Sequence, residues 1–111
     1  MNTKVTQIKA EKVNTDFIMA VGRRKEAVAG VRLYDKAVSL EGIEIKRGEI
    51  VVNGKKAEEY FGKNLEILYK EPLRVTNTED AFAISVRARG GGKAGQAQAI
   101  VLGLSRALDK H

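Results

Sequence analysis

The stretch VRARGGGKAGQAQAIVLGLSRAL, residues 86–108, decides the fold of this chain. It continues the segment AFAISVRAR (81–89), where apolar and polar side chains alternate as in a strand with one buried face. Three glycines follow. From Lys93 an apolar stripe at helical spacing then predicts a helix that runs to the end of the chain. We therefore expect a strand, a glycine loop and a helix in direct succession.

Working outward, DFIMAVGRRKEAVAGVRLY (16–34) predicts two strands around a short basic turn, GRRKE (22–26). Residues 35–48 alternate weakly and predict an irregular connection or a small ribbon. EIVVNG (49–54) predicts a short strand that ends in an Asn-Gly turn.

The segments KAEEYF (56–61) and NLEILYKE (64–71) predict helices, the second ended by Pro72. LRVT (73–76) and AFAISVRAR predict a further hairpin across NTED (77–80). Strands joined by hairpins, with the helices kept separate, predict an α+β domain: one mixed sheet with helices packed on one face. We place this single domain at residues 17–111, after a flexible extension at 1–16.

The composition excludes several kinds of site. A chain of 111 residues without cysteine has no disulfide or thiolate zinc site, and its one histidine is the terminal His111. We predict no metal, no cofactor and no catalytic residue. No apolar run approaches the roughly 20 residues that span a bilayer, and residues 1–16 lack the apolar core of a signal peptide. We expect a soluble protein of a reducing compartment, with no membrane partner.

Positive charge gathers at both ends of the chain. Residues 1–34 hold seven Lys/Arg and three acids, a net of +4, and residues 81–111 hold five and one, again +4. Residues 35–80 hold eight and ten, a net of −2. If the two ends pair in space, they form one positive face, which is typical of a polyanion-binding protein.

The glycine loop invites a nucleotide-binding interpretation. GGGKAG (90–95) satisfies G-x-G-x-x-G after a strand and before a helix. Only 16 residues follow Gly95, however, too few for a second strand with its acidic end. The phosphate loop of nucleotide hydrolases needs Ser or Thr after its lysine, where this chain has Ala94. Both motifs are therefore incomplete.

A nucleic-acid phosphate suits the loop better. Arg87 and Arg89 share one strand face, roughly 7 Å apart. The glycines expose backbone N–H groups beside the positive end of a helix dipole, and Lys93 and Gln96 lie in the first turn of that helix. Several cations close together neutralise several phosphates at once. A second basic group occurs in the predicted hairpin, whose tip carries Arg23, Arg24 and Lys25, with Arg32 and Tyr34 sharing one face of the following strand.

Two stretches together resemble the signatures of the universal small-subunit ribosomal protein nine family: AVGRRKEAVAGVRLY (20–34) and VRARGGGKAGQAQAIVLGLSRAL (86–108). VVNGKKAEEYF (51–61) and EPLRVTNT (71–78) are similar to its middle, in the same order. The resemblance implies a fold like the second domain of ribosomal protein five. It also implies a non-catalytic role in translation, in which the protein binds small-subunit rRNA in the subunit head beside neighbouring ribosomal proteins. The location would be the ribosome of the cytoplasm, with an organellar ribosome left open.

Carried over by position, the resemblance implies RNA contacts at two places, and strand geometry together with the basic loop adds Arg32, Arg87 and Lys93. The implied contacts are Arg23, Arg24, Lys25, Arg89, Gly90, Gly91, Gly92 and Gln96. The family continues in a basic tail that reaches transfer RNA, whereas this sequence stops at ALDKH (107–111), so no transfer-RNA contact is predicted. Two alternatives stay open: a small nucleotide-binding domain that uses GGGKAG, and a free-standing RNA-binding chaperone.

Overall fold

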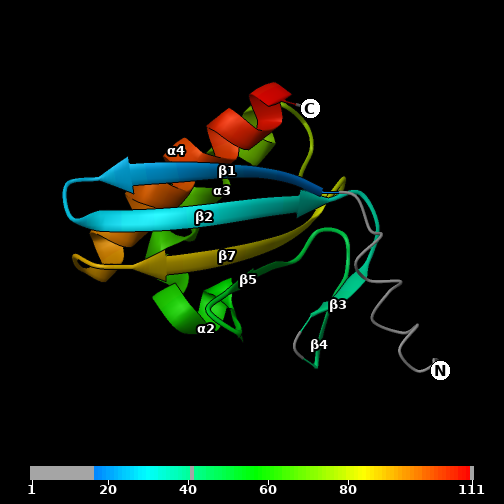
Figure 1. Cartoon of the computed structure of the whole chain (residues 1–111), viewed down its shortest axis with the longest axis horizontal. Helices are drawn as coiled ribbons and strands as arrows, with labels where there is room; N and C mark the ends of the chain where they lie inside the picture. Colours follow the sequence, from blue (N-terminus) through cyan, green and yellow to red (C-terminus); the bar gives the residue numbers. More distant parts are fainter. Residues whose placement is uncertain (1–16, 41, 111) are drawn as a thin grey trace, which may run out of the picture.

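A computed structural model describes residues 17–40 and 42–110 of the chain. It shows a five-stranded sheet, a separate two-stranded ribbon, and helices on one face of the sheet (Figure 1). The N-terminal extension expected at residues 1–16 lies outside the described residues. The predicted α+β class, a mixed sheet covered by helices on one face, is confirmed.

The strands follow the spatial order β1-β2-β7-β5-β6. β5 runs parallel to β7, and the other neighbours in the sheet are antiparallel. Strands from both ends of the chain, β2 and β7, therefore lie side by side in the middle of the sheet. The bounds are β1 (Phe17–Arg24), β2 (Ala27–Tyr34), β5 (Ile50–Val52), β6 (Lys55–Lys56) and β7 (Ala83–Arg89).

The helices are α2 (Ala57–Phe61), the short 3-10 turn η1 (Lys63–Leu65), α3 (Glu66–Val75) and α4 (Lys93–Lys110). α4 lies across β1 and β2, and α3 packs beside α4 (Figure 1). None of the helices in the described ranges combines the length and apolarity that a membrane crossing needs.

The main core lies between the sheet and α4, and every second side chain of β2 lines its sheet side. One set of side chains in β2 is buried in this core, as the alternation predicts. The apolar stripe of α4 packs against these side chains. The buried set in β2 is Ala27, Ala29, Val31 and Leu33, and that in α4 includes Ala99, Ile100, Leu104 and Ala107.

The structure overturns the strand expected at residues 73–76. α3 continues through Pro72 to Val75 and is followed by a loop, so there is no hairpin across 77–80. Tyr69, Pro72 and Leu73 are all buried, and their spacing of three and four residues places them on one helical face. Burial of that face against the core outweighs the loss of one backbone donor at proline. Thr76 caps the C-terminal end of α3, because its Oγ1 donates a hydrogen bond to the Pro72 carbonyl at 2.9 Å.

Residues 35–48 form the small ribbon that was one of the two expectations for them. Its strands are β3 (Val38–Leu40) and β4 (Ile43–Ile45). Ile45 is buried in a second apolar cluster with Tyr34, Val51 and Ala83. These three partners lie on the face of the sheet that α4 does not cover, so the ribbon caps one end of that face (Figure 1).

Candidate nucleic-acid interface

We call the side of β1, β2 and β7 that points away from α4 the open face. Val28 of β2 pairs with Arg23 of β1 on one side and with Arg89 of β7 on the other. Residues in cross-strand register point to the same face, so two arginines flank Val28 about 10 Å apart, twice the spacing of neighbouring strands. Both side chains are exposed.

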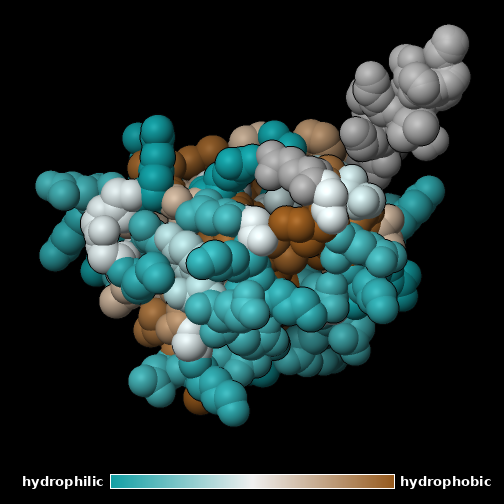
Figure 2. All heavy atoms as spheres, turned by 90° about the horizontal axis from the view of Figure 1, so that it is seen from below, coloured by the Kyte–Doolittle hydropathy of each residue, from teal (hydrophilic) through white to brown (hydrophobic). Residues whose placement is uncertain are grey.

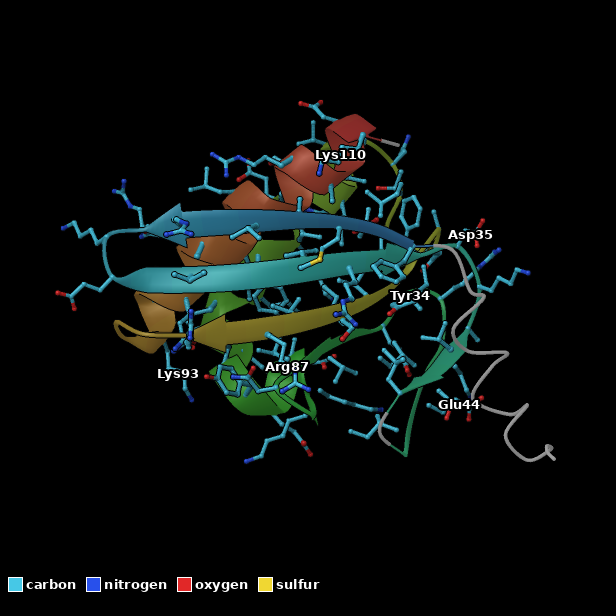
Figure 3. All side chains as sticks on the ribbon, viewed as in Figure 1. Tyr34, Asp35, Glu44, Arg87, Lys93 and Lys110 are labelled. Atoms are coloured by element: carbon cyan, nitrogen blue, oxygen red, sulfur yellow. The ribbon has the colours of Figure 1, made fainter. Side chains whose placement is uncertain are left out.

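The next two outward-facing cross-strand pairs of β2 and β7 continue the same pattern. Gly30 pairs with Arg87, and Arg32 pairs with Ser85. Figure 3 shows Arg87 on the part of β7 that faces the reader, whereas α4 lies behind the sheet. No acidic residue occupies an outward position of β1, β2 or β7. With four arginines and no carboxylate between them, the open face carries a positive potential that a polyanion would lower.

Aromatic side chains border this arginine group at the ribbon end. Phe17 is 44% exposed although it is large and apolar. The Cζ of Arg32 lies 5.1 Å from the centre of the Phe17 ring, within the range of a cation–π contact. The ring of Tyr34 lies 5.3 Å from that of Phe17. Tyr34 itself is buried, so Phe17 is the ring that this surface exposes beside Arg32. An exposed aromatic ring beside a guanidinium is typical of sites that stack unpaired bases.

The hairpin tip differs from the expectation. β1 and β2 are joined by only two residues, Lys25 and Glu26, because Arg24 already pairs with Ala27. A left-handed conformation at Lys25, with φ of 56°, makes this tight turn. Of the three expected tip cations only Lys25 is in the turn. Arg23 belongs to the strand and points to the open face.

Arg24 points to the opposite side, toward α4. Its Nε donates to Oε1 of Gln98 at 2.8 Å. Arg24 and Lys25 line a hollow of about 420 Å³ together with Glu26, Gly91 and Gly92, so two cations and one carboxylate border it. The hairpin and the glycine loop, more than 60 residues apart in sequence, therefore form a single edge of the molecule.

The three glycines of the loop have different reasons to be glycine. Gly90 and Gly91 have φ of 78° and 58°, in the left-handed region that favours glycine. A Cβ on Gly90 would collide with the carbonyl of Glu26, and one on Gly91 would lie 3.3 Å from the Cβ of Ala27. Gly92 has neither constraint, and space is open around it. Close packing against the hairpin therefore explains two of the glycines.

A hydrogen-bond network, which the sequence did not reveal, holds this loop from below. Asn53 follows β5 and bonds the β7 backbone with its side chain: Oδ1 accepts from Ala88 N and Nδ2 donates to Ala88 O, both at 2.9 Å. The same Nδ2 lies 3.2 Å from the hydroxyl of Tyr60, which donates to Oε1 of Gln96 at 2.8 Å. Gln96 then donates from Nε2 to the carbonyl of Gly90 at 3.1 Å.

This network changes the interpretation of two expected contact residues. Gln96 is only 7% exposed, and the oxygen and the nitrogen of its side-chain amide both form hydrogen bonds within the protein. Lys93, at the start of α4 (Figure 3), donates from Nζ to the carbonyl of Tyr60 at 2.9 Å and lies 4.1 Å from the centre of that ring. Lys93 is thus a cation at a defined position, and Gln96 is part of the support under Gly90.

The signals for this network were present but ambiguous. The pair Asn53-Gly54 predicts only a turn, whereas in the structure the left-handed Asn53, with φ of 51°, also aims its amide at β7. The ring of Tyr60 packs against the core. Its hydroxyl partner, however, is 36 residues away, and no local pattern reports such a pairing.

The lower side of the molecule has a mixed surface. Viewed from below, mainly hydrophilic side chains surround small hydrophobic patches (Figure 2). Within residues 17–40 and 42–110, no three His, Cys, Asp or Glu side chains gather where they could hold a metal ion. A small α+β domain with four arginines on the outward positions of three neighbouring strands, beside a glycine loop, defines the class: a domain suited to bind a polyanion.

Comparison with known proteins agrees with this class. Residues 22–111 match the sequence model of the ribosomal protein S9/S16 family. The small ribosomal subunit protein uS9 of Maridesulfovibrio salexigens is 47% identical over 97 residues, which cover 86% of this chain and 67% of that protein. The protein of the same name from Lawsonia intracellularis is 40% identical over 97 residues, with the same shares covered.

The chain belongs to the ribosomal protein S9/S16 family. It is a structural, non-enzymatic constituent of the small ribosomal subunit and acts in translation. The resemblance noted in the sequence is thereby confirmed, and the nucleotide-binding interpretation of GGGKAG is set aside. The partners of the chain are, in general terms, rRNA and other ribosomal proteins.

Proposed function

We propose that the chain binds small-subunit rRNA through one cationic surface that extends over the open face and the adjoining loop edge. The observation that carries the proposal is the register of β1, β2 and β7, which brings arginines from both ends of the chain together on one face. The cationic surface consists of Arg23, Arg32, Arg87 and Arg89 on the open face and Arg24, Lys25, Gly90, Gly91, Gly92 and Lys93 at the loop edge.

The two parts of this surface suit different features of RNA. On the open face, arginines whose Cα atoms lie about 10 Å apart can each meet a different phosphate. At the loop edge, the backbone N–H groups at the start of α4 add the positive end of a helix dipole. Gln96 contributes by positioning: its bond to Gly90 O holds the loop in place, and the buried amide itself does not reach the RNA.

The salt dependence of binding tests the electrostatic part. If about five of the seven cations meet phosphates, log K for a fragment of small-subunit head rRNA falls with log salt with a slope of roughly −3.5 to −4.5. Arg89→Ala removes one contact, so we expect affinity to fall by about 1–3 kcal/mol and the slope to become shallower by about 0.7–0.9.

Arg74→Ala is the matched control. Arg74 is also an exposed arginine, but it lies on α3 and donates to the carbonyl of Ile67 at 3.1 Å. The charge lost is the same, so a general effect of net charge would weaken both variants equally. Equal losses for Arg74→Ala and Arg89→Ala, or a slope near zero in the parent protein, would contradict the proposed surface.

Assembly in the cell can be followed by sedimentation of the tagged chain, with the small-subunit fractions washed at high salt. The chain should remain with the cytoplasmic small subunits. Release of the parent chain at modest salt would instead mean that the cationic surface alone does not hold the chain on the subunit.

A further inference from the structure

Gly30 lies in the middle of β2, where glycine normally weakens a strand. Its backbone does not require glycine, since its φ is not positive. Its surroundings do not require glycine either: a Cβ there would contact only Cε of Met19, at an ordinary 3.8 Å. Gly30 thus differs from Gly90, whose φ and neighbours both exclude a side chain. A strand glycine marks a bulge, a tight bend, or a place where a ligand or another backbone approaches closely. β2 pairs residue for residue with both β1 and β7, without a bulge at Gly30, and this leaves a close approach from the open face as the reason that we pursue.

Gly30 forms part of the floor of a hollow of about 360 Å³ on the open face. This volume lies near the lower end of the roughly 300–1,000 Å³ typical of small-ligand sites. The hollow is bounded by apolar side chains of β1 and the ribbon and by guanidinium groups of β2 and β7. Besides Gly30, its lining includes Met19, Arg32, Ile43, Ser85 and Arg87.

The chemistry of this lining fits one planar, partly polar group attached to a negative charge. Met19 and Ile43 provide apolar walls that a flat ring can contact. Arg32 lies two residues beyond Gly30 on β2, and Arg87 is the cross-strand partner of Gly30 on β7. A guanidinium at either place can stack on a base or bond a phosphate. The hydroxyl of Ser85 can donate to or accept from a base edge. A nucleotide of RNA has all of these complementary features.

We propose that this hollow receives one unstacked base of the bound RNA, held between Met19 and the ribbon, with Arg32 and Arg87 on its backbone. The inference rests on the proposed function and deepens it. The loop edge contacts phosphates irrespective of base pairing, whereas the hollow selects a place where one nucleotide has left the helical stack. It also assigns a role to the ribbon of residues 35–48, which forms one wall of the site.

The test compares two RNA hairpins that differ by one base. Both carry a single-nucleotide bulge; in the second the bulged nucleotide is abasic, so the number of phosphates is the same. Stacking of one base on a protein platform is worth roughly 1–3 kcal/mol. The parent protein should therefore bind the hairpin with the base at least about fivefold more tightly, by fluorescence anisotropy.

Gly30→Val fills the hollow from its floor and leaves every cation in place. We expect this variant to bind both hairpins equally, with the salt slope of the parent. A β-branched residue suits a strand better than glycine, so the variant should melt at or above the parent temperature by circular dichroism. Ser85→Leu fills the same hollow from β7 and serves as the second variant if Gly30→Val does not fold.

Val28→Ile is the matched control, because it also adds bulk to the open face but lies outside the hollow. It should keep the preference for the base. Equal binding of the two hairpins by the parent, or a preserved preference in folded Gly30→Val, would overturn the base site while leaving the cationic surface intact. Failure of the parent to bind either hairpin or head rRNA at low salt would remove the proposed function and this inference together.

Discussion

Gly22 of β1 and Gly103 of α4 lie in direct backbone contact across the core. A Cβ on Gly103 would lie 3.2 Å from the Gly22 nitrogen and 2.8 Å from Cγ2 of Val31, and a Cβ on Gly22 would collide with the carbonyl of Ala99. The pair therefore sets how closely α4 approaches the sheet. Since α4 also begins at the glycine loop, this contact positions the loop edge of the cationic surface.

Gly103→Ala should lower the free energy of unfolding by about 1–3 kcal/mol, the cost of overpacking a tight core. Gly95→Ala is the same substitution on the same helix, but its Cβ would lie at an ordinary 3.6 Å from that of Ala27. It should raise stability by about 0.5–1 kcal/mol, because alanine is the better helix former. Urea denaturation of both variants gives the comparison. A stabilised Gly103→Ala would mean that the helix can move away from β1 at no cost.

Within the glycine loop, alanine substitutions at Gly90 and at Gly92 should likewise differ in their effect on stability. Gly90→Ala places a Cβ against the Glu26 carbonyl at a positive φ, so we expect a loss of about 1–3 kcal/mol. Gly92→Ala has free space and should leave the melting temperature within a few degrees of the parent. Similar melting temperatures for the two variants would show that the loop is not held against the hairpin.

Two tyrosines give opposite expectations for one substitution. The Tyr60 hydroxyl lies between Asn53 and Gln96, and Tyr60→Phe leaves the Gln96 oxygen without its donor. We expect the free energy of unfolding to fall by about 1–2 kcal/mol. The Tyr69 hydroxyl is buried with no hydrogen-bond partner in the described part of the chain. Tyr69→Phe should therefore be neutral or stabilise by about 1 kcal/mol.

Urea denaturation at neutral pH measures both changes. A second measurement on Tyr60→Phe follows hydrogen exchange at residues 90–92, which should become faster because the support under Gly90 is weakened. If Tyr69→Phe costs as much as Tyr60→Phe, the two hydroxyls are in equivalent environments and the network carries no special stability.

Tyr69 also predicts how stability changes in alkali. Burial, together with the nearby charges of Glu58 and Glu66, raises the pKa of Tyr69 from 10.0 to about 12. Between these values the folded chain keeps a proton that the unfolded chain has lost. The stabilisation from this group is therefore complete below pH 10 and is lost as the pH rises from 10 to 12.

The loss per pH unit is at most about 1.4 kcal/mol. Unfolding measured from pH 9 to 11.5 should therefore show a steeper decline for the parent than for Tyr69→Phe. Subtracting the two curves removes the common effect of lysine deprotonation. Parallel curves would indicate that Tyr69 reaches water before it ionises.

Local patterns were sufficient to predict β2, β7 and α4, because burial on one side imposes a period of two on a strand and a period near four on a helix. The same alternation showed that Arg87 and Arg89 share a face. It was not sufficient at Pro72, which is an interior residue of α3. Proline tends to end a helix, but here the burial of Tyr69 and Leu73 in the core stabilises the helix through Pro72, so the tertiary contacts outweigh the local preference.

The sequence by itself determined the periodic elements and the separation of charge along the chain, since each of these depends on residues that are close in the sequence. Only the tertiary structure decided that Arg23 and Arg89 flank Val28 and that Gln96 supports Gly90. It also decided that Gly22 must be glycine, whereas Gly30 need not be. These relationships depend on the order of strands and on contacts between distant residues, and those arise when the whole core is buried at once.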